Sequence, residues 1–388
     1  MTSMHGGGIA IVGASETTGI GSLPGISMLN LHADAARNAL ADAGLTTRDV
    51  DGVATAGPLA HEVSHHLGIT PRWLDGTMVG GCSFMLHVRH AAAAIAAGAA
   101  DVVLVTHGES GRSRVGMGGR GPNPSSAQGQ FEAVYGAQAP YSTFTVPALH
   151  FLQERGLERE ALAQVVVAQR EWAIGNPRAS RRTATTVEAV LEQPPVAWPF
   201  SKDMCCVVTD GGGALVLMSS ERAADLPAAD RAVYLLGSGE SAEAPMVSQM
   251  ADPGSFQAFR RASAEAFATA GITHGDVDHL MAYDAFAHLP LYMLEDLGFV
   301  GRGESRDFIA DGNTGKGGRL PMNTNGGGLS YTHTGMYGMF AIQEAVRQLR
   351  GEAHPKVQVP NCDLALAHGT GGMLGIRHAA STCILERA

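Results

Sequence analysis

Cysteine is scarce in this chain. The 388 residues include five cysteines, and apart from the adjacent Cys205 and Cys206 they are scattered, without the regular spacing of a disulfide framework. None belongs to the Cys-x-x-Cys pair that is typical of a zinc site. His65, His66 and Asp75 lack the helical spacing of a metal motif. We therefore predict a reducing compartment and no metal site.

Positive charge and long apolar runs are also scarce. The sequence has 27 Lys and Arg against 37 Asp and Glu, a formal net charge of -10. Without a basic patch, nucleic acid and anionic membranes are poor candidate partners. No apolar run is long enough to cross a bilayer, because His and Arg interrupt even the Ala-rich stretch. Residues 1–8 lack the basic start and apolar core of a signal peptide, so we predict a cytoplasmic protein.

The chain has ample apolar material, with 45% hydrophobic residues, for one large core or two ordinary domains. One stretch organises it. In the stretch 78–84 small residues end at Cys82, an Ala-rich helical run follows at 87–98, and an apolar β-type run at 101–108 comes next. This order predicts a turn that places Cys82 at the N-terminus of a buried helix. Backbone N–H groups and the helix dipole there favour a thiolate, so we expect a lowered thiol pKa. A small buried structural cysteine is the alternative.

The sequence contains an internal duplication of a large unit. A helical run that ends at Gly, followed by Thr and then by Asp-Val-Asp, occurs at 34–51 and recurs at 261–278. The Gly-rich run before His333 precedes a helix that ends near 350, just as the run before Cys82 precedes the helix that ends at Gly98. The strand that ends at His368 corresponds to the strand that ends at His107. Two βαβ-rich halves that face each other bring helix N-termini to one centre. We expect Cys82, His333 and His368 to converge there.

A long insertion in the first half has no counterpart in the second. Its first part, residues 111–140, is rich in Gly, Ser and Pro and is predicted to loop over the surface. Helical segments are expected at 146–155 and 157–172, with a break at Gly156. Inserted elements of this kind commonly contact the substrate, and we expect the acyl-carrier part of the substrate to lie against them.

Together these motifs resemble the thiolase superfamily. The resemblance rests on the duplication, the cysteine before an Ala-rich helix, Asp210-Gly-Gly-Gly-Ala, the Asn-Thr-Asn-Gly-Gly-Gly-Leu run with His333, and the late His-Gly-x-Gly-Gly. The chain is most similar to bacterial relatives of the sterol-carrier-protein thiolases. The resemblance implies the α/β thiolase fold, two duplicated βαβ-rich halves that form a five-layered αβαβα core. The expected halves are residues 1–230, with an insertion at about 108–203, and residues 231–388.

The resemblance also implies a site and its chemistry. Cys82 matches the acyl-accepting cysteine, and His333 would take its proton. Tyr283 could donate its phenol to an enolate or thioester oxygen, or only pack. His368 stands where many thiolases carry a second cysteine that acts as acid and base. The expected oxyanion-binding glycines are Gly369, Gly371 and Gly372. Coenzyme A would be a substrate, with no bound cofactor and a homodimeric assembly.

These residues predict transfer of an acyl group through a cysteine acyl-enzyme, either thiolysis of a 3-oxoacyl-CoA or the reverse Claisen condensation. A retro-aldol lyase on the same fold is the nearest alternative, because relatives that resemble the sterol-degradation aldolases use tyrosines in place of the catalytic pair. A non-catalytic subunit that pairs with a small OB-fold protein carrying a zinc ribbon is another, and such a partner could also serve an active enzyme. A decarboxylating condensing enzyme is a further possibility.

Overall fold

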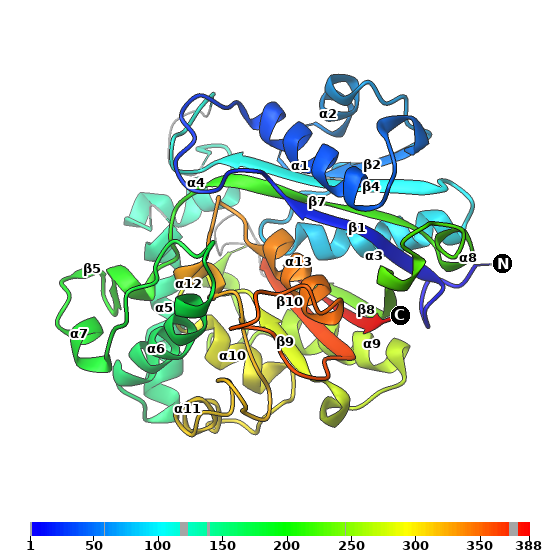
Figure 1. Cartoon of the computed structure of the whole chain (residues 1–388). Coiled ribbons are helices and arrows are strands. Elements are labelled where there is room, and N and C mark those ends of the chain that lie inside the picture. Colours follow the sequence, from blue (N-terminus) through cyan, green and yellow to red (C-terminus); the bar gives the residue numbers. More distant parts are fainter. Residues whose placement is uncertain (1, 58, 117–122, 138–139, 245, 372–378) are drawn as a thin grey trace.

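Nine strands form one mixed sheet in this protein. A computed structural model describes residues 2–57, 59–116, 123–137, 140–244, 246–371 and 379–388. The strand order is β3-β2-β4-β7-β1-β8-β11-β10-β9 (Figure 1). The strands are β1 (Ile9–Glu16), β2 (Gly52–Thr55), β3 (Trp73–Asp75), β4 (Val102–Ser110), β7 (Asp210–Ser219), β8 (Val233–Ala242), β9 (His279–Ala282), β10 (Leu364–Gly371) and β11 (Ala379–Arg387).

The sheet is joined at its middle by a short seam. Strands β1 and β8 pair only through Ala10 with Tyr234 and Ile11 with Val233. Away from this seam the two parts of the sheet separate and enclose two helices, α3 (Ser83–Ala96) and α13 (Gly338–Leu349), as Figure 1 shows. Each of these helices contacts strands of both parts.

One further helix covers each outer face. Helix α1 (Met28–Asp42) contacts β1, β4 and β7, and helix α9 (Gln257–Ala270) contacts β8 and β11. The order from top to bottom in Figure 1 is therefore helix, sheet, helix, sheet, helix. The predicted five-layered αβαβα core is confirmed.

The duplication seen in the sequence recurs in the structure. Helices α1 and α9 are each followed by a one-turn 3-10 helix, Thr47–Asp49 and His274–Asp276, and then by the strands β2 and β9. Both turns begin with a capping box, formed by a Thr and by the Asp three residues later. Asp51 accepts hydrogen bonds from the backbone at the start of β4, and Asp278 does the same for β10. Equivalent local sequence thus ties each half together in the same way.

The insertion is mostly helical where the structure describes it. Helix α5 (Pro140–Arg155) and helix α6 (Glu160–Gly175) are separated by Gly156, whose φ of 61° is in the left-handed region. The predicted break is confirmed, although α5 begins earlier than expected. Shorter elements complete this region: α4 (Ala127–Phe131), α7 (Val187–Leu191), β5 (Pro195–Ala197) and β6 (Phe200–Ser201).

The remaining helices are α2 (Ala60–Leu67), α8 (Ser220–Ala223), α10 (Leu289–Asp296), α11 (Ser305–Ala310) and α12 (Gly327–Ser330). Among the described residues, no helix combines the length and the apolar character needed to span a membrane.

The N-termini of α3 and α13 meet at the centre of the molecule with no room for a side chain. A Cβ at Gly338 would lie 2.1 Å from the carbonyl oxygen of Gly81, and a Cβ at Gly369 would lie 2.9 Å from Cα of Cys82. These contacts involve backbone, which cannot rotate away as a flexible side chain can. Glycine is therefore required where the two central helices and β10 approach one another.

A methyl group at this contact should be costly. We expect Gly338→Ala to lower the free energy of unfolding by about 1–3 kcal/mol, because overpacking forces backbone shifts. Urea denaturation checks this. The control is Gly275→Ala, where the nearest atom to a new Cβ is a side-chain oxygen 3.7 Å away; equal midpoints for both variants would contradict the packing argument.

Candidate active site

A buried tyrosine and histidine form the core of the candidate site. Tyr283 follows β9, and His333 follows α12. The Tyr283 Oη and the His333 Nε2 are 2.9 Å apart, and both residues are at most 5% exposed. The backbone N–H of Tyr337 donates to the same Oη at 3.1 Å. Because the phenol oxygen already accepts this hydrogen bond, its own proton is free to point at His333.

Burial keeps both groups of this pair neutral. It lowers the pKa of His333 to about 4 and raises the pKa of Tyr283 well above its ordinary value, although the Tyr337 N–H opposes the latter shift. A neutral imidazole hydrogen-bonded to a phenol can accept the phenolic proton when the phenol in turn takes one from a substrate. The pair is therefore suited to moving a proton away from a substrate hydroxyl.

The segment that carries His333 is held by backbone contacts to the first half of the chain and to Asp284. The Asp284 carboxyl accepts hydrogen bonds from the N–H groups of Gly328 and Leu329, at 2.6 and 3.0 Å. The His333 N–H donates to Oγ1 of Thr209 at 3.2 Å. These contacts hold the backbone that carries His333, so the position of this segment is set before any substrate binds.

Cys82 lies at the predicted place, but its thiol is not activated. The residue is the N-cap of α3, is fully buried, and packs with Val79, Leu86 and Ala379. Burial raises the pKa of the Cys82 thiol, and nearby Glu240 raises it further. The expectation of a lowered thiol pKa was wrong, because the loss of hydration outweighs the helix N-terminus.

Of the predicted oxyanion glycines, two lie against Cys82. Gly369 approaches its Cα, and a Cβ at Gly371 would be 2.5 Å from its Sγ. Gly372 is outside the described residues. The role of these glycines in binding a thioester oxygen remains a prediction.

His368 does not join the other predicted residues. Neighbouring residues of a strand point to opposite faces, and Gly369 faces α3. The His368 ring accordingly faces α9, where it packs edge-on against Phe259 and pairs its Nδ1 with Oγ1 of Thr382 at 2.8 Å. Its predicted convergence with Cys82 and His333 was therefore wrong. Only its backbone reaches the site, since its carbonyl accepts from the N–H of Tyr283.

Two further residues reach the site without having been predicted. Tyr337 is the N-cap of α13, as Cys82 is of α3. Glu109, near the end of β4, places its carboxyl against Gly335, two residues after His333. The position of Glu109 at a strand end was a usable signal, since strand ends of an α/β sheet commonly carry functional groups.

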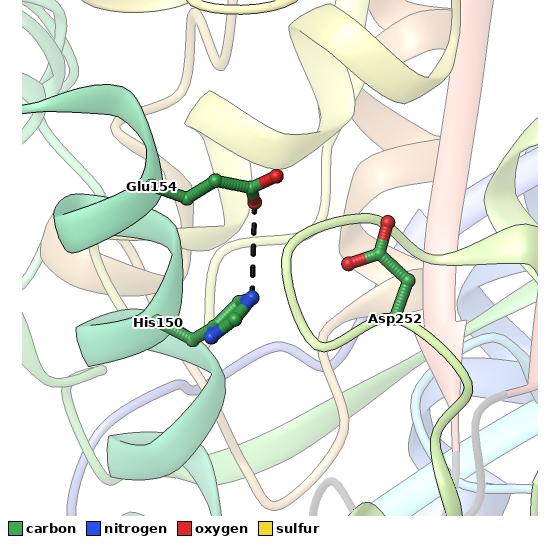
Figure 2. A group of neighbouring side chains, drawn as sticks. All are labelled: His150, Glu154 and Asp252. Carbon is green, nitrogen blue, oxygen red and sulfur yellow. Dashed lines mark ion pairs between the residues drawn. The ribbon is translucent and has the colours of Figure 1, made fainter.

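One group of described side chains could in principle hold a metal ion. His150 and Glu154 lie one turn apart on α5, and Asp252 approaches them from a loop, as Figure 2 shows. The His150 Nε2 is 3.8 Å from Glu154. However, Arg302 pairs with both carboxylates, and Arg155 pairs with Glu154. These guanidinium groups already supply positive charge, so the group is better described as an ion-pair network.

Comparisons with known proteins agree with this architecture. Residues 239–387 match the family described as Thiolase C-terminal domain-like. A steroid side-chain-cleaving aldolase of Thermomonospora curvata is 34% identical over 359 residues, which cover 87% of this chain and 91% of that protein. An acetyl-CoA acetyltransferase of Methanothermobacter thermautotrophicus is 31% identical over 381 residues, 95% of this chain and 97% of that protein. The chain belongs to the thiolase superfamily.

A solved structure supports the fold of this thiolase-superfamily chain. The Ltp2-ChsH2(DUF35) aldolase matches it with a TM-score of 0.89 and 30% identity, over 98% of both chains. The predicted fold and the predicted likeness to sterol-carrier-protein thiolases are thereby confirmed. Because the relatives include both aldolases and acetyltransferases, membership identifies a family of enzymes on this fold but leaves the reaction open.

The buried Cys82 thiol should react slowly. We expect iodoacetamide at pH 8 to label Cys82 much more slowly in the native protein than in urea, because the thiolate is the nucleophile and burial suppresses it. Half-buried Cys205, whose thiol pKa burial also raises, to about 12, is the more accessible internal comparison. Peptide mass spectrometry follows each site, and native labelling of Cys82 ahead of Cys205 would contradict the raised pKa.

The buried histidine on the α9 side should make the protein acid-sensitive. Burial lowers the pKa of His368 to about 3, so below pH 6.5 the unfolded chain binds a proton there that the folded protein does not. Its contribution to stability therefore falls by about 1.4 kcal/mol per pH unit as the pH drops from 6.5. Urea denaturation at pH 7.5 and 5.0 should show that the free energy of unfolding falls less between these pH values in His368→Asn than in wild type. An equal fall in both proteins would refute the role of His368.

Proposed function

We propose that this chain is a carbon–carbon lyase that cleaves a β-hydroxyacyl-CoA thioester by a retro-aldol reaction. The observation that carries the proposal is the buried 2.9 Å hydrogen bond between Tyr283 Oη and His333 Nε2. A phenol and a neutral imidazole suit removal of a hydroxyl proton, whereas acyl transfer needs a thiolate, which burial of Cys82 disfavours. The aldolase of Thermomonospora curvata supports the same choice.

The proposed reaction begins at the β-hydroxyl of the substrate. Tyr283 takes the hydroxyl proton and passes its own phenolic proton to Nε2 of His333. The bond between the α- and β-carbons then breaks, the β-carbon becomes a carbonyl, and the electron pair passes to the α-carbon as a thioester enolate. Protonation of the α-carbon gives the acyl-CoA product. Coenzyme A enters as part of the substrate, and no bound cofactor takes part.

The enolate needs stabilisation of its negative oxygen. The dipole at the N-terminus of α3 favours negative charge, and the N–H groups of Ser83 and Met85 there donate to the carbonyls of Gly80 and Cys82. Gly369 and Gly371 lie beside this helix end. We propose that the thioester oxygen binds there, so that the developing charge lies at the positive end of the helix dipole.

Acyl transfer through Cys82 is the second candidate function. It is favoured by the position of Cys82 as the N-cap of α3, next to Gly369 and Gly371. In this reaction His333 would take the thiol proton, and the acyl-enzyme would pass its acyl group to coenzyme A or to an enolate. The acetyl-CoA acetyltransferase relative supports it.

We also propose two protein partners. A second copy of the chain is expected from the likeness to thiolases. A small OB-fold subunit with a zinc ribbon is expected because the similar aldolase structure is that of Ltp2 together with ChsH2(DUF35). A cytoplasmic location remains a prediction from the sequence.

The two candidate reactions can be separated by product and by variant. We expect wild type to release a free carbonyl compound and an acyl-CoA from a β-hydroxyacyl-CoA, as measured by liquid chromatography with mass detection. Tyr283→Phe should lower kcat by about 100-fold or more, because a proton-transfer group is lost. Cys82→Ala should retain cleavage, and Tyr135→Phe, at a fully solvated phenol that is 89% exposed, is the matched control.

The opposite pattern would identify the second function. Intact mass spectrometry after incubation with 3-oxoacyl-CoA thioesters would then show an adduct of acyl mass on wild type that is absent from Cys82→Ala. Such an adduct, together with no cleavage of β-hydroxyacyl thioesters, would overturn the lyase proposal.

A further inference from the structure

Glu109 brings a carboxyl group into the site from the first half of the chain. It lies near the end of β4, on the face of that strand that looks toward α3 and α13, as His107 does. Its carboxyl sits directly on Gly335, where a Cβ would lie 2.2 Å from Oε1 and 2.4 Å from Oε2. Gly335 has a φ of 136° and follows His333 by two residues. The carboxyl therefore borders the segment that positions the imidazole.

The hydrogen-bonding capacity of this carboxyl is not fully used by the described residues around it. Its Oε2 is buried and has no hydrogen-bond partner among the described residues. Buried polar atoms in folded proteins are nearly always paired, so an unpaired one calls for a reason. The charged and titratable groups that act on Glu109 are Arg114, from the loop after β4, and Tyr283, from the other half. The side chain as a whole is half-buried.

The contrast with Asp284 shows that a structural role would look different. Both carboxyls have a pKa that burial raises to about 8. Asp284, however, uses its two oxygens to accept the N–H groups of Gly328 and Leu329. Asp284 thus holds a segment in place, while Glu109 has an oxygen aimed at no described protein donor.

We infer that Glu109 is the second proton-transfer group of the site and protonates the α-carbon of the thioester enolate. The inference rests on the proposed lyase function and deepens it. In this step the O–H bond of the Glu109 carboxyl breaks, a C–H bond forms with the electron pair of the enolate, and Glu109 is left as a carboxylate. The proton that His333 received from Tyr283 then leaves to solvent, and Glu109 takes one up again.

This assignment gives the two proton-transfer groups opposite states at neutral pH. His333 is neutral and can accept a proton, and Glu109 is protonated and can donate one. Two groups whose environments push their pKa values apart are the usual basis for an acid and a base in one site. The cleavage direction needs the protonated carboxyl, whereas removal of an α-proton from an acyl-CoA needs the carboxylate.

The test uses exchange of the α-protons of acetyl-CoA and propionyl-CoA in D₂O, followed by mass spectrometry. This half-reaction needs no carbon–carbon cleavage. In wild type, exchange should rise with pH through about pH 8, where Glu109 loses its proton. Glu109→Gln should exchange about 100-fold or more slowly and should lose this pH dependence. Glu171→Gln, at an exposed position on α6, is the matched control.

The outcomes separate this inference from the lyase proposal. Exchange that depends on Glu109 without cleavage of any β-hydroxyacyl-CoA would remove the lyase function and keep the proton-transfer role. Exchange within about threefold of wild type in Glu109→Gln, with the same pH dependence, would overturn the role of Glu109. Absence of exchange in wild type on both thioesters would overturn it as well.

A second variant guards against loss of folding. If Glu109→Gln does not fold, Glu109→Asp keeps a titratable carboxyl one methylene further back. We expect it to exchange slowly and to shift the midpoint of the pH dependence, which a purely structural carboxyl would leave in place.

Discussion

The contact between the first turns of α3 and α13 is the constraint on which the rest of this structure depends. Both helices run between the two parts of the sheet and begin at the same point. Gly338 lies on the carbonyl of Gly81, and Gly81 itself has no room for a Cβ, because such an atom would lie 2.2 Å from the Tyr283 ring. The close approach of backbone brings two helix N-termini, Cys82 and Tyr337 into one small volume. Tyr283, which is hydrogen-bonded to His333, packs against this contact, because its ring lies on Gly81 and its Oη accepts from the N–H of Tyr337.

Buried carboxyls in this protein show how partners determine what a charged group does. Glu16 accepts from the hydroxyl of Tyr331 at 2.5 Å and pairs with Arg347 and Arg178, so its pKa is lowered despite full burial. It thereby ties β1 to the segment before His333. Burial disfavours the ionised form of Glu109, and only the charge of Arg114 partly offsets this, so the pKa of Glu109 is raised. Glu16, ionised and held by several partners, supports the fold, whereas the poorly paired Glu109 is the carboxyl that we propose for proton transfer.

The thiol of Cys82 illustrates how two real effects compete. At exposed sites a helix N-terminus favours an anion by about 1 kcal/mol or less. The motif before the Ala-rich helix correctly predicted that Cys82 lies at such an end. In the same turn, however, Cys82 is buried against Val79, Leu86 and Ala379. Removing a thiolate from water costs more than the dipole returns. Position at a helix end can be predicted from local sequence, but solvent access at that end cannot.

The sequence by itself determined the duplicated architecture, the break at Gly156 and the position of Cys82 at the start of a helix, because these follow from local periodicity, turn residues and motif order. It could not determine that His368 turns toward α9, since one residue of register decides which face of β10 a side chain occupies. Nor could it reveal that Glu109 lies on Gly335, because that contact joins segments more than half the chain apart. Only the packing of the two halves decides which polar groups meet, how deeply they are buried and which protonation states they keep.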